Sequence, residues 1–278
     1  LSNFNKIKLS KIVLITGASS GMGKATAQLL LRKGYKVYGA ARRIEKMNDL
    51  KQEGGELLKM DMTDNQSMIS GVEEIIKNEG YLDILINNAG FGLYGAIEDV
   101  PIEQAKYQME VNVFGLARLS QLVLPHMRNN NSGTIINVSS VGGKIANPLG
   151  GWYHASKFAV EALSDSLRME AKQFGIDVIV IEPGGVKSEW GDIAMNHALS
   201  SSREGHYGQM TSKMIETGIR FKNKNVEPEI IADIILKAIR AKVPNIRYSG
   251  GFMAKPLLLL RRLLSDRLMD KMILNQYK

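Results

Sequence analysis

Short apolar runs alternate along this chain with longer segments in which apolar residues recur every three or four positions. The runs have the length and composition of buried strands, and the longer segments have the spacing of one helix face. This alternation predicts one α/β domain, a doubly wound and mostly parallel sheet of about seven strands with helices on both faces. The predicted strands are 11–16, 35–41, 56–61, 82–86, 134–140, 176–181 and 246–249.

Helix signals fill the segments between these runs. The first predicted helix covers 24–33 and ends at Gly34, because glycine suits the left-handed position after a helix. Thr63 to Gln66 has the form of a capping box that opens a helix to about residue 79. Longer helices without an internal break are predicted over 102–128, 227–241 and 256–273.

Residues 186–225 follow a less regular pattern that includes Trp190 and several methionines. A mobile lid over a substrate and a surface helical insertion are both compatible with it, and we favour the lid. His197 and His206 lie in this segment, but their spacing does not indicate a metal site. We therefore expect no bound metal.

A glycine-rich turn joins the first predicted strand to the first helix. Its glycines allow a tight turn and a close backbone approach, and the free N–H groups at the helix start attract a pyrophosphate. A plain turn between strand and helix is the alternative, which three glycines at this spacing make the weaker one. The candidate cofactor residues here are Gly17, Ser19, Ser20, Gly21, Met22 and Gly23.

The second predicted strand ends at Ala41, followed by Arg42 and Arg43. Many dinucleotide-binding folds have an acidic residue here that binds the ribose 2′-hydroxyl. Two arginines suit a 2′-phosphate instead, so NADP(H) is favoured over NAD(H) as cofactor. The next strand ends near Asp61 and Met62, where Asp61 either meets the adenine edge or shapes the turn.

Tyr153 and Lys157 are four residues apart at the start of a helical pattern, so they lie on one helix face. Free tyrosine has a pKa of about 10, and we expect the lysine to lower it so that Tyr153 acts as general acid and base. Ser140 ends a predicted strand, where functional side chains collect. Asparagine has a low helix propensity, so we expect Asn112, inside a predicted helix, to have polar partners or a functional role.

Composition limits the remaining possibilities. The 278 residues are 44% hydrophobic and 23% charged, as in globular proteins, and no apolar run is long enough to span a membrane. The chain has no cysteine, which excludes disulfides and fits a cytoplasmic location. The net charge of +8 is spread along the sequence and does not indicate nucleic-acid binding. Residues 1–10 are interpreted as a leader or an expression remnant, because they contain no secretory apolar region.

The ordered motifs Thr16-Gly-x-x-x-Gly-x-Gly23, Asn87-Asn-Ala-Gly90, Asn112, Ser140, Tyr153-x-x-x-Lys157 and Pro183-Gly184 resemble the short-chain dehydrogenase/reductase family in its single-domain form. The resemblance covers roughly residues 11–188. It implies a Rossmann-like sheet, a nicotinamide cofactor and hydride exchange with a carbonyl or alcohol. Substrate identity is left open, although apolar residues in the predicted lid favour a hydrophobic compound.

The resemblance also implies roles for particular residues. Tyr153 exchanges the proton, Lys157 lowers its pKa and holds the nicotinamide ribose, Ser140 bonds the substrate oxygen, and Asn112 supports a water-linked path to the lysine. Further cofactor contacts are implied for Asn88, Ala89, Gly90, Pro183, Gly184, Val186 and Ser188. A non-catalytic NADP-binding redox sensor and an extended-type enzyme acting on nucleotide sugars are the alternatives.

The predicted organisation is a catalytic domain over 11–255 and a helical extension over 256–278. Leu257, Leu260, Leu264, Leu268 and Met272 form one apolar stripe of this extension at helical spacing. Other leucines fall around the rest of the helix, so packing on the domain alone does not account for all of them. A cover for the substrate pocket or a subunit contact in a homo-oligomer is favoured over attachment to a membrane surface.

Overall fold

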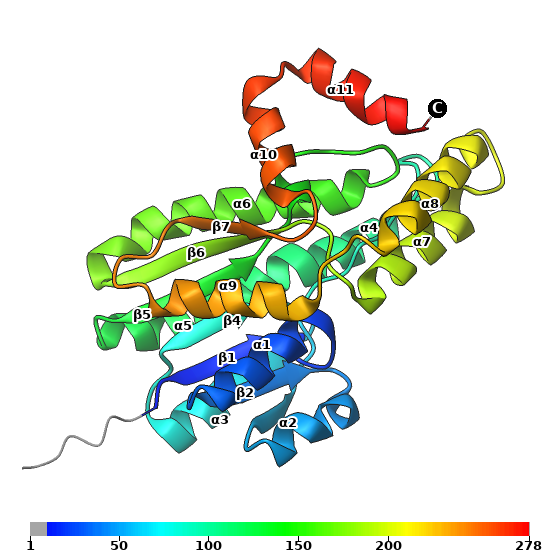
Figure 1. The fold of residues 1–278 in the computed structure, drawn as a ribbon. Helices are drawn as coiled ribbons and strands as arrows, with labels where there is room; N and C mark the ends of the chain where they lie inside the picture. The colour runs from blue at the N-terminus through cyan, green and yellow to red at the C-terminus, as the bar shows by residue number, and fades with distance from the viewer. Residues whose placement is uncertain (1–9, 278) are drawn as a thin grey trace, which may run out of the picture.

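The computed structural model describes residues 10–277, so the predicted leader, apart from Ser10, lies outside the described residues. Its seven strands form one sheet in the order β3-β2-β1-β4-β5-β6-β7 (Figure 1). All neighbouring strands are parallel, which confirms the predicted doubly wound architecture. The strands are β1 Ile12–Thr16, β2 Lys36–Ala41, β3 Glu56–Lys59, β4 Ile84–Asn87, β5 Gly133–Val138, β6 Ile176–Pro183 and β7 Arg247–Gly250.

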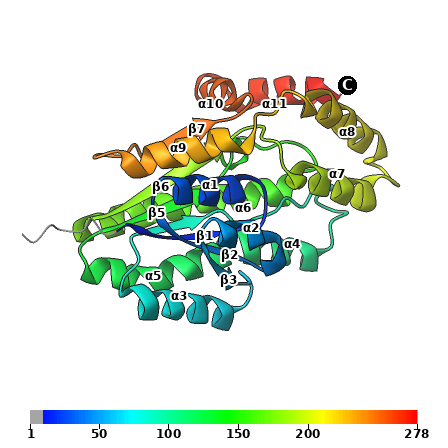
Figure 2. The ribbon, with the colours of Figure 1, turned by 60° about the horizontal axis from the view of Figure 1, so that its bottom comes forward.

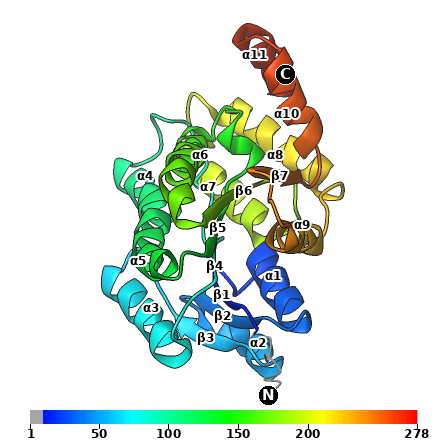
Figure 3. The same ribbon diagram turned by 90° about the vertical axis from the view of Figure 1, so that its left-hand side faces the viewer.

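Helices cover both faces of this sheet (Figure 2). Seen end-on, α3 and α5 lie on one face, and α1 and α9 lie on the other (Figure 3). The α-helices are α1 Gly21–Arg32, α2 Asn48–Gln52, α3 Asn65–Glu79, α4 Ile102–Met109, α5 Leu116–Asn129, α6 Gly151–Ala171, α7 Glu189–Ser202, α8 Gly208–Lys222, α9 Pro228–Arg240, α10 Ala254–Leu263 and α11 Asp266–Leu274.

The sheet is buried on both faces, which explains why its strands are almost continuously apolar in sequence. In β1, Val13 and Ile15 join the cluster beneath α1 and α9, whereas Leu14 joins the cluster beneath α3 and α5. Successive side chains of a strand point to opposite faces, so one short apolar run supplies both cores. These two cores hold the carboxyl ends of the strands at one edge of the sheet.

The start of α3 differs from the predicted capping box by one residue. Asp64 is the capping residue, since its Oδ1 accepts hydrogen bonds from the backbone N–H groups of Gln66 at 2.9 Å and Ser67 at 3.3 Å. The Thr63 hydroxyl instead donates to Asp61 Oδ1 at 2.9 Å. The carboxylate can accept two N–H bonds at the helix N-terminus, and the threonine is left to shape the turn before it.

The long helix predicted over 102–128 is also interrupted. Residues 110–115 form a π-helical segment between α4 and α5, and Asn112 lies within it. The Asn112 amide exchanges hydrogen bonds with the backbone of Phe91, at 3.1 Å to its N–H and 2.9 Å to its carbonyl. It also donates to Ser156 Oγ at 3.0 Å. The wider turn thus places a polar side chain where it fixes the loop after β4.

The C-terminal extension forms two helices, so the prediction of one unbroken helix over 256–273 was wrong. Leu264 has extended backbone angles, and Arg261 bridges the break by pairing with Asp266 at 2.8 Å. The break shifts the buried face by one residue, so that Met269 is buried and Leu268 is exposed. No helix in residues 10–277 is both long and apolar enough to cross a membrane.

Candidate active site

A cavity of about 640 Å³ opens at the carboxyl ends of β1, β2, β4, β5 and β6. This is the edge at which open α/β sheets bind their ligands. Gly23 and Asn112 are the two predicted residues that do not line it. The other predicted residues all do: Gly17, Ser19, Ser20, Gly21, Met22, Arg42, Arg43, Asp61, Met62, Asn88, Ala89, Gly90, Ser140, Tyr153, Lys157, Pro183, Gly184, Val186 and Ser188.

The glycine loop between β1 and α1 makes the tight turn that the sequence predicts for a pyrophosphate-binding loop. Gly17 and Gly21 have φ angles of +68° and +54°, which other residues adopt only with strain. A Cβ on Gly17 would lie 2.8 Å from Asn88 Nδ2, and one on Gly23 would overlap the Gly17 carbonyl oxygen. The loop therefore stays close to the start of α1, whose first N–H groups can bind an anion.

A second loop is locked against this one. Thr16 Oγ1 accepts hydrogen bonds from the backbone N–H groups of Asn88 at 3.1 Å and Ala89 at 3.0 Å. In return, Asn88 Nδ2 donates to the Thr16 carbonyl at 3.0 Å. Asn88 thus holds the ends of β1 and β4 together, and it leaves Gly90 free to face the cavity. The fold and these loops fit a dinucleotide cofactor.

Arg42 and Arg43 line the cavity beside Asp61, and each already has a partner. Arg42 Nη1 donates to the Tyr107 hydroxyl at 2.7 Å. Arg43 Nη2 lies 3.6 Å from a carboxylate oxygen of Glu189 at the start of α7. Both members of this ion pair are about half exposed, so the pair contributes at most about 1 kcal/mol and leaves Arg43 available to a stronger anion.

Ser140, Tyr153 and Lys157 come together behind this region. Lys157 Nζ donates a hydrogen bond to the Val138 carbonyl at the end of β5, at 2.8 Å. Tyr153 is one turn earlier in α6 and only 6% exposed. Ser140, whose Oγ accepts a hydrogen bond from the Gly142 N–H at 3.0 Å, lies close enough to Tyr153 to lower its pKa. The geometry brings two hydroxyl groups and one ammonium to the same end of the cavity.

The charge states of Tyr153 and Lys157 reflect their burial. Burial raises the pKa of Tyr153 to about 12, and the Ser140 side chain offsets only part of this. Burial lowers the pKa of Lys157 to about 8, against a smaller opposing effect of the Glu161 carboxylate. Burial therefore destabilises both charged forms, and the expectation that Lys157 favours the tyrosinate stays a prediction. The phenol is protonated at neutral pH.

An apolar and aromatic wall completes the cavity, and the motifs did not identify it. The Trp190 ring from α7 lies 5.0 Å from the Tyr153 ring and 5.8 Å from that of Tyr94, measured between centroids. Ile145, Ile193, Leu257, Met272 and Ile273 line the same space. The predicted lid over 186–225, with Trp190, and the apolar stripe of the C-terminal segment were the sequence signals for parts of this wall. Among residues 10–277, no cluster of side chains is suited to hold a metal ion.

Comparison with known proteins gives consistent results. A family model described as short chain dehydrogenase matches residues 11–197. The chain is 37% identical to the 3-ketodihydrosphingosine reductase of Bacteroides thetaiotaomicron, over 87% of this chain and 88% of that protein. It is 33% identical to the NADPH-dependent 3-dehydrocapnine reductase of Ornithobacterium rhinotracheale, over 96% and 98%. The crystal structure of a short-chain dehydrogenase from Streptomyces avermitilis is similar with a TM-score of 0.79 and 30% identity, over 91% and 92%.

The buried ammonium of Lys157 predicts a measurable stability effect. At pH 7 the folded protein bears the cost of burying this charge, so Lys157→Met should raise the free energy of unfolding by about 1–3 kcal/mol. The pKa of Lys157 is about 8 in the folded protein, below its ordinary value of 10.5. Between pH 8 and pH 10.5, the unfolded wild-type protein therefore binds more protons than the folded protein does. Wild-type stability therefore rises across that window, and the advantage of the variant should shrink.

Urea denaturation of both proteins from neutral to alkaline pH measures this difference. Lys77→Met on α3 is the matched control, because Lys77 is exposed. A Lys157→Met variant that is less stable than wild type at pH 7, or a difference that does not change with pH, would contradict the interpretation.

Proposed function

Because this chain belongs to the short-chain dehydrogenase/reductase family, we propose that it is an NADPH-dependent reductase of a ketone on an apolar substrate. Membership of the family makes it an NAD(P)-dependent oxidoreductase of carbonyl or alcohol compounds. The observation that carries the finer proposal is the buried phenol of Tyr153, which shares with Ser140 a cavity that has an apolar wall.

In this proposal Tyr153 is the general acid. The reduced nicotinamide, when bound, supplies the hydride that the ketone carbon accepts. Tyr153 donates its phenolic proton to the carbonyl oxygen, and the Ser140 hydroxyl donates a second hydrogen bond to the same oxygen. A phenol with a pKa of about 12 holds its proton at pH 7, so the acid is present before each turnover.

Lys157 and Asn112 support the proton transfer. The Lys157 ammonium binds the nicotinamide ribose and stabilises the charge on Tyr153 once its proton has left. A Cβ at Gly90 would lie 3.1 Å from Asn112 Oδ1 and 3.6 Å from Lys157 Nζ. The glycine therefore keeps the space between these two groups free of a side chain, which is compatible with a water-linked path between them.

NADPH is the proposed cofactor because the end of β2 carries two arginines and no acidic residue that could bind the ribose 2′-hydroxyl. A 2′-phosphate is a stronger partner for Arg43 than the half-exposed carboxylate of Glu189. The name of the Ornithobacterium relative, which specifies NADPH dependence, supports the same cofactor.

The proposed substrate is an apolar ketone. The wall formed by Ile145, Leu257, Met272 and Ile273 offers no charged group to a ligand, so it favours an extended hydrocarbon portion. The names of the two relatives, which specify reduction of 3-ketodihydrosphingosine and 3-dehydrocapnine, support a ketone as the reacting group.

The segment 186–225 is proposed to cover the substrate. It contains α7 and α8, and Trp190 of α7 packs against the Tyr153 ring. The Thr217 hydroxyl of α8 donates to the Gln276 carbonyl at 3.3 Å, which joins the cover to the C-terminal extension. Two segments that lie apart in sequence therefore close the apolar end of the cavity together.

A homo-oligomer and a cytoplasmic location stay predictions. Large apolar side chains are exposed on α4, on α6 and in the π-helical segment, on the face that includes Ile102, Phe114 and Phe158. Glu103 and Glu110 are exposed residues of the segment 102–115. Exposed apolar patches of this kind favour a subunit contact.

Replacement of the acid tests the mechanism. Tyr153→Phe should lower kcat for ketone reduction by roughly 10²–10⁴-fold while NADPH binding persists, because only the proton donor is lost. NADPH oxidation with a good ketone substrate and a fluorescence titration of NADPH measure the two effects. A kcat close to wild type would refute the assignment, and full loss of NADPH binding would mean that the ring mainly supports the fold.

Removal of the two arginines tests the cofactor. The double variant Arg42→Ala, Arg43→Ala should weaken NADPH binding by roughly 10²-fold, because charge-assisted bonds to the 2′-phosphate disappear. NADH binding should change little, since NADH lacks that phosphate. Arg240→Ala on α9, at an exposed position, is the control. An unchanged ratio of the NADPH and NADH dissociation constants would contradict the proposal.

Polar substitution in the apolar wall tests the substrate class. Leu257→Gln should raise KM for long-chain ketones by roughly tenfold and leave KM for short ketones nearly unchanged, because only a long chain reaches this wall. Leu260→Gln is the matched control, since Leu260 packs in the same cluster but does not line the cavity. Equal effects of the two variants, or no dependence on chain length, would argue against an apolar substrate.

A further inference from the structure

The outer face of α10 and α11 carries exposed leucines that the fold does not use. Leu259 and Leu263 are one turn apart on α10 and are 57% and 72% exposed. Leu268 and Leu274 on α11 are 54% and 43% exposed. The opposite side of both helices is buried against Ile145. These helices are therefore apolar on two sides, and only the inner side has a partner within the described chain.

Cationic side chains surround these leucines. Residues 254–277 contain five arginines and lysines and two aspartates. Four of the cations, Lys255, Arg262, Arg267 and Lys271, are exposed. One of the aspartates, Asp266, is paired with Arg261 at 2.8 Å. Leucines flanked by arginine and lysine are typical of a helix that lies in the interface of an anionic membrane.

The position of these helices links this face to the cavity. In Figure 1, α10 and α11 project from one end of the molecule, beyond the sheet. Their inner side supplies Leu257, Met272, Ile273 and Gln276 to the cavity lining. The same two short helices therefore line the apolar end of the cavity with their inner side and carry the exposed leucines on their outer side.

We propose that the outer face of α10 and α11, centred on Leu259, Leu263 and Leu268, docks on an anionic lipid surface. An apolar ketone dissolved in that surface then enters the cavity past these helices, a step that rests on the proposed function. The leucines insert at the level of the headgroups, and the four exposed cations bind lipid phosphates. Docking of this kind requires no membrane-spanning helix.

Charge favours a lipid surface over a second copy of this chain. In a twofold dimer formed through this face, identical patches meet, so the exposed cations of one copy would face those of the other. The segment 102–115, which includes the exposed Ile102 and Phe114, differs because it carries charges of both signs, with Glu103 paired to Lys106 at 2.9 Å. That segment is better suited to a subunit contact, and the C-terminal face is better suited to an anionic surface.

Vesicle sedimentation with the full chain tests the proposal. The probes are phosphatidylcholine vesicles with and without phosphatidylglycerol, at low and high salt. We expect binding to the anionic vesicles that high salt weakens. Arg262→Glu with Arg267→Glu should reduce it by about tenfold or more, as should Leu259→Ser with Leu263→Ser. The charge control is Lys51→Glu with Lys77→Glu, two exposed residues on α2 and α3 at the far end of the molecule.

Three results would overturn the proposal: no binding to anionic vesicles, equal loss in the charge control, or binding that is insensitive to both C-terminal variants. Light scattering without vesicles tests whether a second copy of this chain covers the face instead. A fall in mass caused by Leu259→Ser with Leu263→Ser would assign the face to that copy and overturn the proposal. Every variant should reduce a short, water-soluble ketone at the wild-type rate, which shows that it is folded. Sedimentation needs no substrate, so its failure is distinguishable from failure of the proposed reaction.

Discussion

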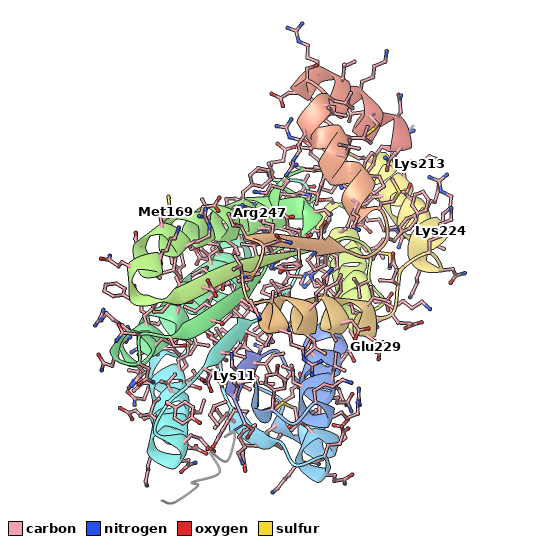
Figure 4. The ribbon with its side chains drawn as sticks, turned by 60° about the vertical axis from the view of Figure 1, so that its left-hand side comes forward. Lys11, Met169, Lys213, Lys224, Glu229 and Arg247 are labelled. Atoms are coloured by element: carbon pink, nitrogen blue, oxygen red, sulfur yellow. The ribbon has the colours of Figure 1, made fainter. Side chains whose placement is uncertain are left out.

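The hydrogen bond from the Lys157 ammonium to the Val138 carbonyl determines the geometry of the site. It ties α6 to the end of β5, with Tyr153 one turn before the lysine and Ser140 two residues after Val138. Further contacts hold the same face of α6 one and two turns later, where Arg247 of β7, labelled in Figure 4, binds Glu161 at 3.0 Å and Asp165 at 2.7 Å. The helix is therefore fixed to two strands of the sheet, β5 and β7. Burial of the ammonium costs free energy on folding. The hydrogen bond itself is stronger than one between neutral groups, because its donor is charged.

The two ends of the cavity are connected through α7. Glu189 begins this helix and faces Arg43, while Trp190 packs on Tyr153. Adjacent residues of one helix turn thus contact the cofactor end and the reacting end.

The fold was predictable from sequence because buried parallel strands leave an uninterrupted apolar signal, as in β1 and β6. The cavity-lining residues were predictable because they follow strand ends in fixed motifs. Other features depend on tertiary contacts. Asn112 lies in a π-helical turn because Phe91 and Ser156 bind its amide. Met269 replaces Leu268 in the core because of the bend at Leu264. The tyrosine pKa depends on burial, which the spacing of Tyr153 and Lys157 does not contain.

The direction of that pKa shift bears on the chemistry that the protein performs. Oxidation of an alcohol requires Tyr153 to accept a proton, so the phenolate must form first, and burial opposes it. Reduction of a ketone requires the phenol, which burial favours at neutral pH. In the proposed function the apolar wall would have two effects, because it would bind the hydrocarbon part of a substrate and, by excluding water, would keep Tyr153 protonated. A more polar wall would weaken both effects together.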